Sequence, residues 1–404
     1  MKTMKVALLA TVAFAAVTVG ARADDTAALK AELEALNARV AQLEAAPAVP
    51  TGYSLLTITD GQASKIPGIT ETSKDLAAYG DKATVIGIMP TADMPASTTI
   101  EWSGYVRAAI VHYSYQNPKT SDDTSLLNRG QLKVVGKTDT AVGEVGARIQ
   151  LRAESDLGAS LGVKPTWVSN EYWGWWAMTP ELTLGGGFTG SLGNIGYGYD
   201  GACTCYITDS ADVDFNPGDA QQMRLSYASG PISAAIALED ATNLSKKFGG
   251  GSSALGVAGE VKFTGDAVNG EVSAVYHNNG TANSRANTWQ VGAGIGFSLG
   301  DMATLSIAAA DGHIASGQGF WGASAILSAN LSDAVHAEIA YGFKNYNNHI
   351  TNLAPSGTDN TGILAGIYYD PVSQLTIGLE GELRNPRGSH NNITTIDLVT
   401  VFRF

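Results

Sequence analysis

Residues 394–404 read TTIDLVTVFRF, and this stretch alternates between apolar and polar side chains up to Phe404. One face of an extended chain here carries Ile396, Leu398, Phe402 and Phe404, interrupted by Thr400. The opposite face carries Asp397 and Arg403. A period of two predicts a β-strand with one buried face. The fold therefore depends on the medium that covers the apolar side.

The same alternation fills the chain from Thr98 onward. In VGEVGARIQLRAES, residues 142–155, the polar face carries Glu144, Arg148, Gln150, Arg152 and Glu154, and valine, alanine, isoleucine and leucine alternate with them. QLTIGLEGELR, residues 374–384, repeats the pattern with Glu380, Glu382 and Arg384. Runs of about ten residues exceed the strands of about 5–6 residues that are commonest in globular proteins.

The connections between these runs alternate in length. Short turns such as SGPI, residues 229–232, are followed by long polar segments such as NYNNHITNLAPSGTDN, residues 345–360. Bacterial outer-membrane barrels combine short turns at one end with long loops at the other. Only helices or a closed barrel satisfy every backbone group in lipid. We therefore predict an all-β fold, a 16-stranded antiparallel transmembrane β-barrel over residues 98–404.

The first 23 residues resemble a secretory signal peptide. Lys2 and Lys5 precede an apolar run that ends at Val19, and Ala21-Arg22-Ala23 forms a small-x-small cleavage site. Such a run is too short to span a membrane. Cleavage would leave 22 basic and 38 acidic residues and a net charge of −16. An exported chain this acidic is a poor partner for nucleic acid.

Residues 24–46 predict a short coiled-coil helix. The spacing of its apolar residues alternates between four and three, as in a heptad seam. The seam comprises Leu29, Leu33, Leu36, Val40 and Leu43, and Arg39 and Glu44 occupy flanking positions that pair between helices. A helix this short is marginal alone, so we expect it to trimerise; a single amphipathic helix lying on its own domain is the alternative. Residues 47–97 are rich in turn formers and predict a linker or small accessory element.

These features together resemble the trimeric 16-stranded porins of Gram-negative outer membranes, most closely the alphaproteobacterial branch. The resemblance rests on the signal peptide, the sixteen alternating runs, a long third loop and the terminal Phe404. It implies passive diffusion of ions and small hydrophilic solutes through a homotrimer in the cell outer membrane, among lipid and lipopolysaccharide. It also implies that Phe404 is an assembly signal for the outer-membrane assembly machinery, and that the helix projects into the periplasm. Residues 51–97 have no counterpart in the plainest porins.

A barrel of this size leaves an aqueous channel, and the resemblance implies that the third loop folds inward to narrow it. That loop, residues 190–220, carries Asp200, Asp209, Asp212, Asp214 and Asp219. Inward positions on the early strands carry a candidate basic wall of Arg107, Arg129, Lys133, Arg148 and Arg152. Opposed acids and bases would set ion preference. Alternatively, these charges lie at the solvated rims of the barrel, because alternation fixes which face of a strand a residue occupies but not its position along the barrel axis.

Cys203 and Cys205 lie two residues apart in the same loop. A local disulfide is favoured over free thiols in an oxidising compartment. The neighbouring aspartates could bind Ca²⁺, but their spacing does not match an EF-hand, and a solvated acidic loop is the commoner outcome.

No pattern predicts catalysis, a cofactor or a dedicated metal site. The histidines His277, His313, His336 and His349 are scattered, and no G-x-S-x-G elbow accompanies them. Three alternatives to a general pore remain: a substrate-specific channel, a structural tether that engages the cell wall through residues 24–97, and a secreted soluble β-protein.

Overall fold

The structure is a computed structural model, and it describes residues 56–67, 69, 77–89, 97–117, 119–155, 166–208, 213–240, 255–278, 287–314, 318–347, 360–385 and 392–404. The predicted signal peptide and coiled-coil helix lie outside these residues. So do Asp209, Asp212 and His349.

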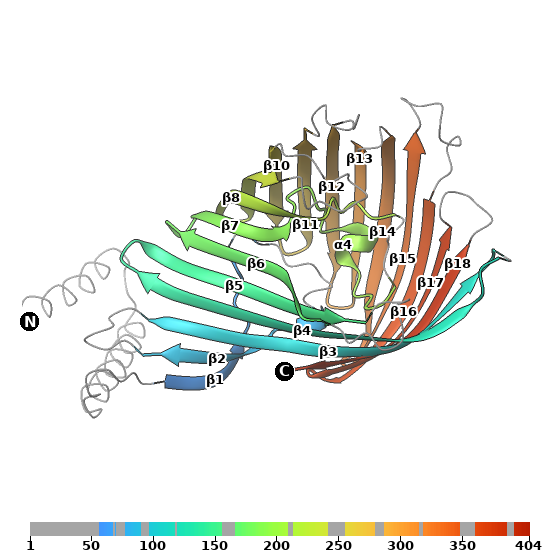
Figure 1. Ribbon diagram of the computed structural model, residues 1–404, viewed down its shortest axis with the longest axis horizontal. Helices are drawn as coiled ribbons and strands as arrows, with labels where there is room; N and C mark the ends of the chain where they lie inside the picture. Colours follow the sequence, from blue (N-terminus) through green and yellow to red (C-terminus); the bar gives the residue numbers. More distant parts are fainter. Residues whose placement is uncertain are drawn as a thin grey trace, which may run out of the picture. The chain divides into compact units, whose positions relative to one another are not determined.

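Sixteen antiparallel strands, β3 to β18, form a closed barrel (Figure 1). Each strand pairs with the next along the chain, and β18 pairs with β3 through Ile393–Arg403 opposite Tyr105–Tyr115. The strands are β3 (Thr98–Tyr115), β4 (Asp123–Thr140), β5 (Gly143–Glu154), β6 (Val168–Ala177), β7 (Leu182–Gly190), β8 (Asp219–Ser229), β9 (Ile232–Asp240), β10 (Leu255–Thr264), β11 (Val268–His277), β12 (Thr288–Leu299), β13 (Ala303–His313), β14 (Gly319–Ser332), β15 (Val335–Asn347), β16 (Asn360–Val372), β17 (Leu375–Asn385) and β18 (Ile393–Arg403). The predicted sixteen-stranded barrel is confirmed.

The two ends of the barrel differ in the length of their connections. Among the connections between β3 and β18, those at the end where β4 joins β5 and β16 joins β17 are all short, such as residues 141–142 and 373–374. We call this end the turn end. The other end carries the long connections, including residues 191–218 between β7 and β8, and we call it the loop end. Phe404 lies at the turn end, because β18 pairs there with the end of β17 that follows the 373–374 turn.

The faces of β18 show what covers the apolar side chains. Asp397 is 1% exposed and Val399 and Val401 are fully buried, so this face points into the barrel. Phe402 is 51% exposed, and Ile396 and Leu398 are similarly uncovered on the outside. The barrel therefore has an apolar exterior and a mixed interior, the reverse of a water-soluble barrel.

Glycines in the wall make room for large aromatic side chains inside. A Cβ atom on Gly146 of β5 would lie 2.1 Å from the ring of Trp175, and one on Gly185 of β7 would lie 2.2 Å from the ring of Trp173. Both tryptophans are buried on β6. The 47 glycines of the chain thus include positions at which an aromatic ring from a neighbouring strand fills the space of the missing side chain.

Residues 47–97, expected as a linker or accessory element, contribute two further strands. β1 (Leu56–Gln62) and β2 (Lys82–Ile88) pair as an antiparallel hairpin. β2 also pairs with the first residues of β3, Thr98–Trp102. β2 therefore lies on the same edge of β3 as β18. It pairs with residues of β3 that are closer to the turn end than those that pair with β18. In the described part of the chain, no helix has the length and apolar character needed to cross a membrane.

Candidate functional site

The described residues of the third long loop, 191–208 and 213–218, lie inside the barrel. It includes a short helix, α4 (Gly198–Ala202), which lies against β13 and β14 (Figure 1). Leu192, Ile195 and Phe215 of the loop are buried against inward side chains of the wall. Those wall residues are the small side chains Ala237, Ala258, Val275, Ala308 and Ala310, together with Phe320. Small residues on these strands leave space for the loop, so the inward fold that the resemblance implied is present.

Carboxylates and hydroxyls of the wall bind the backbone of the first half of the loop. Glu239 on β9 accepts hydrogen bonds from the Leu192 N–H at 3.0 Å and the Ser191 hydroxyl at 2.9 Å. Glu271 on β11 accepts the Gly196 N–H at 2.5 Å. Buried backbone N–H groups need partners, and bonds to a carboxylate are stronger than neutral ones. Wall acids therefore hold the loop in place.

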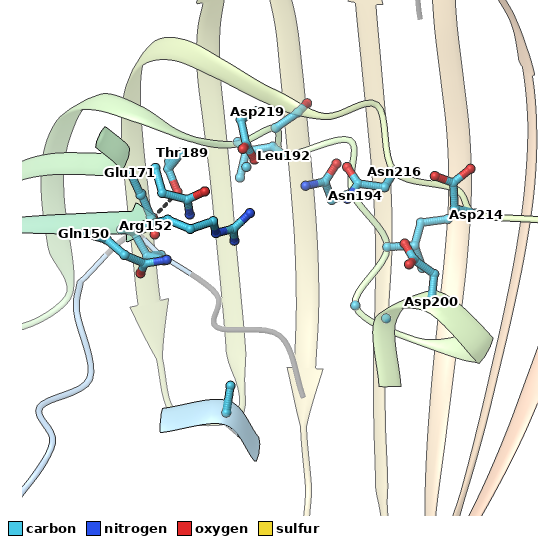
Figure 2. Close-up of a pocket in the computed structure, with 18 of the residues that line it drawn as sticks. Gln150, Arg152, Glu171, Thr189, Leu192, Asn194, Asp200, Asp214, Asn216 and Asp219 are labelled. Atoms are coloured by element: carbon cyan, nitrogen blue, oxygen red, sulfur yellow. Dashed lines mark hydrogen bonds between the residues drawn. The ribbon is translucent and has the colours of Figure 1, made fainter. Parts of the chain in front are cut away.

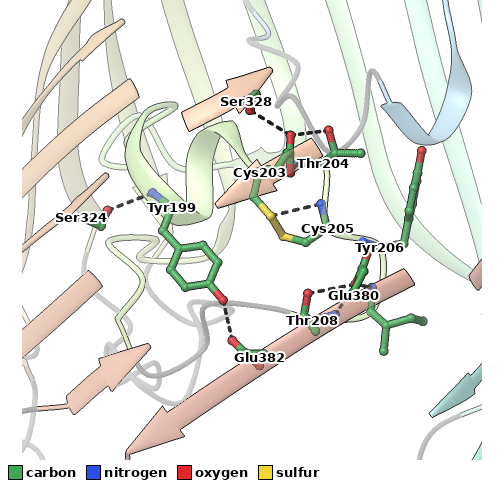
Figure 3. Close-up of a disulfide and its surroundings, with 12 residues drawn as sticks. Tyr199, Cys203, Thr204, Cys205, Tyr206, Thr208, Ser324, Ser328, Glu380 and Glu382 are labelled. Atoms are coloured by element: carbon green, nitrogen blue, oxygen red, sulfur yellow. Dashed lines mark hydrogen bonds between the residues drawn. A yellow bond between two sulfur atoms is a disulfide. The ribbon is translucent and has the colours of Figure 1, made fainter. Parts of the chain in front are cut away.

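The second half of the loop is held in the same way (Figure 3). Glu338 on β15 accepts the Thr204 N–H at 2.9 Å and the Thr204 hydroxyl at 2.8 Å. Glu380 on β17 accepts the N–H groups of Tyr206, Ile207 and Thr208 at 2.5, 3.0 and 2.9 Å, and the Thr208 hydroxyl at 2.9 Å. The alternation placed Glu338 and Glu380 inside the barrel but gave them no role. They anchor the loop.

The loop bears a disulfide whose two cysteines flank the residue that Glu338 anchors. Cys203 and Cys205 are bonded, with Cα atoms 5.3 Å apart, and both side chains are buried (Figure 3). Thr204, between them, is the residue that Glu338 binds through both its N–H and its hydroxyl. Beyond them, burial raises the pKa of the Tyr206 phenol to about 12, so this side chain stays neutral and can donate a hydrogen bond.

A cavity of about 450 Å³ lies between the loop and the strands on the opposite wall. Figure 2 shows Gln150, Arg152 and Glu171 on one side of it and Asp200, Asp214 and Asn216 on the other. The charged residues that line it are Arg107, Arg129, Arg148, Arg152, Glu171, Asp200, Asp214, Asp219, Arg224, Glu260 and Lys262. Four of the five expected wall bases and the three described loop aspartates of the predicted set thus line one cavity.

The wall bases are held by acids on strands β5 and β6. Arg129 hydrogen-bonds to Glu154, and the Arg107 guanidinium lies 3.6 Å from the same carboxylate. Arg148 is paired with Glu171 of β6. Arg152 is the most exposed of the four bases, with 29% of its side chain accessible, and it lies 3.9 Å from Glu154. These ion pairs fix the guanidinium groups at the cavity wall.

Lys133 does not line this cavity. Its Nζ lies 4.2 Å from the centre of the Tyr79 ring, and its side chain is buried toward the turn end. The alternation of polar and apolar residues predicted correctly that Lys133 points into the barrel. Its position along β4 is closer to the turn end than that of Arg129. Arg224, which sequence reasoning did not select, lines the cavity instead and donates to the Gly190 carbonyl at 2.9 Å.

No group of three or more histidine, cysteine, aspartate or glutamate side chains with metal-binding geometry occurs among the described residues. Asp209 and Asp212, on which the Ca²⁺ alternative also depends, are outside them.

No protein-family model matches the sequence, and a search of curated proteins finds no match. Solved structures do match. A loop-deletion mutant of OmpT, an outer membrane protein of Vibrio cholerae, has a TM-score of 0.57 at 10% identity, over 76% of this chain and 99% of that one. An anion-selective porin from Comamonas acidovorans has a TM-score of 0.56 at 11% identity, over 76% and 100% of the two chains.

A mutant of the Rhodopseudomonas blastica porin has a TM-score of 0.50 at 13% identity, covering 76% of this chain and all of that one. At such low identity a structural likeness is informative about architecture. The chain therefore has the sixteen-stranded β-barrel fold of the porins.

Proposed function

We propose that this protein is an outer-membrane porin, a channel through which ions and small hydrophilic solutes diffuse. The single observation that carries the proposal is the charged cavity inside a closed barrel whose outer face is apolar. Water and solutes can enter a polar interior, and only lipid is a suitable neighbour for the exterior.

The exterior supports a membrane location. Large apolar side chains are exposed around the barrel, among them Val106, Ile110, Ile149, Leu238, Val272, Ile339, Leu379 and Phe402. A contiguous apolar surface of this extent is unusual on a soluble protein. The wall has no free edge, because β18 pairs with β3. Closure meets the requirement that every backbone group be paired within the hydrocarbon layer.

In this proposal the turn end faces the periplasm and the loop end faces the outside. The predicted helix at residues 24–46 would then project into the periplasm, and three copies would bundle there to support a homotrimer. Lipid and lipopolysaccharide would surround the barrels, and Phe404 would be read by the assembly machinery. In this arrangement the N-terminal part of residues 24–97 would contact the cell wall.

The proposal contains no catalytic step. Among the described histidines, His277 lies 3.1 Å from Glu239 and His336 lies 2.9 Å from Asp370, so each contacts a carboxylate. Neither arrangement places a histidine against a serine nucleophile.

Recording from purified protein in a planar lipid bilayer tests the proposal. We expect stepwise increases in current, with closures in groups of three when a trimer is present. Protein that is soluble without detergent, or that leaves the bilayer non-conducting at every concentration, would contradict it.

A further inference from the structure

In the connection between β1 and β2, the residues that the structure describes lie inside the barrel, at the turn end. We call its described residues, 63–67, 69 and 77–80, the inner segment. The hairpin strands on either side of it pair up to Gln62 opposite Lys82. The connection therefore leaves and rejoins the sheet at one point, as an inserted loop does.

The first anchor of the inner segment is an inward carboxylate of β3. Glu101 is 5% exposed and accepts the Ser64 N–H at 2.8 Å, and it also accepts the Ser64 hydroxyl. Lys137 of β4 lies 3.3 Å from the same carboxylate. Ser64 is thus held to the inner wall by charge-assisted hydrogen bonds.

The second anchor is apolar. Ile66, which is 4% exposed, packs with Ile69 against Val135 of β4 and against Trp173 and Trp175 of β6. All three wall residues point into the barrel. Burial of an isoleucine side chain is favourable, so this contact stabilises the position of the segment inside the barrel.

The third anchor is Arg403, the last residue of β18. Its guanidinium donates to the Ala77 carbonyl at 2.9 and 2.5 Å and to the Ala78 carbonyl at 3.1 Å. Next to them, the Tyr79 ring meets the ring of Tyr105 edge-on, with centres 5.2 Å apart. The inner segment is therefore fixed near its start, at Ser64 and Ile66, and near its end, at Ala77 and Ala78.

The inner segment also meets the third loop and the cavity. The Tyr206 hydroxyl of the loop donates to the Ala77 carbonyl at 3.3 Å. Ile69 and Ala78 line the same cavity as Arg107 and Asp200. In Figure 2 a pale blue ribbon from this early part of the chain lies below the labelled residues. A solute that passes the third loop therefore reaches the inner segment next.

We propose that the inner segment is a second constriction of the channel, on the turn side of the third loop, and that it limits both the conductance and the size of solutes. This inference rests on the proposed porin function. The third loop and the inner segment then act in series, with the charged cavity between them. Removal of the inner segment should widen the path while leaving the third loop, the basic wall and the barrel unchanged.

The register of the hairpin permits a clean deletion. Because Gln62 and Lys82 are paired, residues 63–81 can be replaced by Asn-Gly, which forms a two-residue hairpin turn. We expect this variant to show a single-channel conductance about twofold or more above that of the natural protein, because pore dimensions control conduction. Liposome swelling should extend to larger sugars.

A point substitution provides an independent test. Ile66→Asp places a carboxylate among Val135, Trp173 and Trp175, where a buried unpaired charge is unfavourable, so the segment should leave the wall and conductance should rise. Ile58→Asp is the matched control, because Ile58 of β1 is 69% exposed, and it should leave conductance unchanged. Circular dichroism verifies the barrel in each variant.

The outcomes separate the two proposals. If the natural protein does not conduct, the porin function is wrong. If it conducts and a folded deletion variant keeps the natural conductance and size limit, the second constriction is wrong. If the deletion variant does not fold, the test uses Ile66→Asp, and natural conductance in a folded Ile66→Asp variant shows that the second constriction is wrong. Increased conductance in Ile66→Asp and not in Ile58→Asp supports the second constriction.

Discussion

The carboxylate of Glu380 accepts both the N–H and the hydroxyl of Thr208, each at 2.9 Å, and so ties the third loop to β17. The same carboxylate accepts two further N–H groups, from Tyr206 and Ile207. A hydrogen bond to a charged group contributes about 1.5–3 kcal/mol. This one side chain therefore contributes much of the interaction that holds the loop against the wall.

We expect Glu380→Gln to loosen the third loop. The substitution removes the charge and turns an –NH₂ group toward backbone N–H donors, so some of these donors lose their partner. Single-channel traces should show added current noise and brief closures, because a less restrained loop fluctuates within the pore. Glu181→Gln is the control, since Glu181 lies in an exposed turn and, in the described contacts, its side-chain carboxylate accepts only from the nearby Thr179 hydroxyl. Noise that is equal in both variants would contradict the anchoring role.

We expect Arg152→Gln to shift ion selectivity toward cations. Arg152 lines the cavity and is the least buried of its four wall arginines, so loss of its charge lowers the local concentration of anions. The permeability ratio of cation to anion should rise by about twofold, since rings of charge set ion preference in pores. The measurement is the reversal potential in a salt gradient.

Lys119→Gln is the matched control for this shift, because Lys119 is exposed at the loop end, outside the cavity lining. Arg148→Gln should act in the same direction as Arg152→Gln. It also leaves Glu171 without its ion-pair partner, so it should destabilise the barrel as well. If neither arginine substitution alters the reversal potential, the basic wall does not set selectivity.

The loop aspartates should act in the opposite direction. Asp200→Asn combined with Asp214→Asn removes two negative charges from the loop side of the cavity. The reversal potential should therefore move toward anions, while conductance changes little because the side-chain volumes are preserved. Asp301→Asn, in an exposed turn, is the control. A shift toward cations in the double variant would show that the loop aspartates do not favour cations in the channel.

The architecture could be predicted from sequence because one rule repeats in every strand. Alternation fixes which face of a strand a residue occupies, and Asp397 and Phe402 lie on the expected opposite sides of the wall. Alternation leaves the height along the strand open. Arg129 and Lys133 share a face of β4, but one lines the cavity and the other lies under Tyr79.

The function of the wall glutamates could not be predicted for a different reason. The partner of an inward glutamate is water, an arginine or a backbone N–H group, depending on the path of a loop distant in sequence. Glu338 binds Thr204, a residue 134 positions away. The same limit applies to Ser64 and Glu101, 37 positions apart, and it explains why residues 47–97 read only as a linker or accessory element.

Removal of the disulfide should leave the channel open and conducting. Cys203→Ser combined with Cys205→Ser deletes a bond that closes a very small ring, so its entropic contribution is limited to about 2 kcal/mol or less. Glu338 continues to hold Thr204 between the two substituted positions, and Glu380 continues to hold Thr208 after them. We expect the conductance of the serine variant to equal that of the natural protein. A large change in conductance would show that the disulfide, rather than the carboxylates, sets the position of the loop.

Barrel closure at the turn end depends on Gly104 and Phe404. Their backbones exchange hydrogen bonds of 3.1 and 3.0 Å, and a Cβ atom on Gly104 would lie 2.5 Å from the Phe404 ring and 2.8 Å from the Gln131 carbonyl oxygen. Gly104→Val should therefore displace Phe404 and reduce the yield of closed barrel in the outer membrane. The yield can be measured as the fraction that migrates as a compact species in unheated detergent gels.

Gly136→Val provides the comparison, because a Cβ atom on Gly136 of β4 would meet nothing within 4 Å. Valine is well suited to an open strand position, so this variant should assemble at least as well as the natural protein. Deletion of Phe404 should reproduce the defect of Gly104→Val if the ring itself is read during assembly. A normal yield from Gly104→Val, together with a low yield from the deletion, would separate recognition of Phe404 from its packing on Gly104.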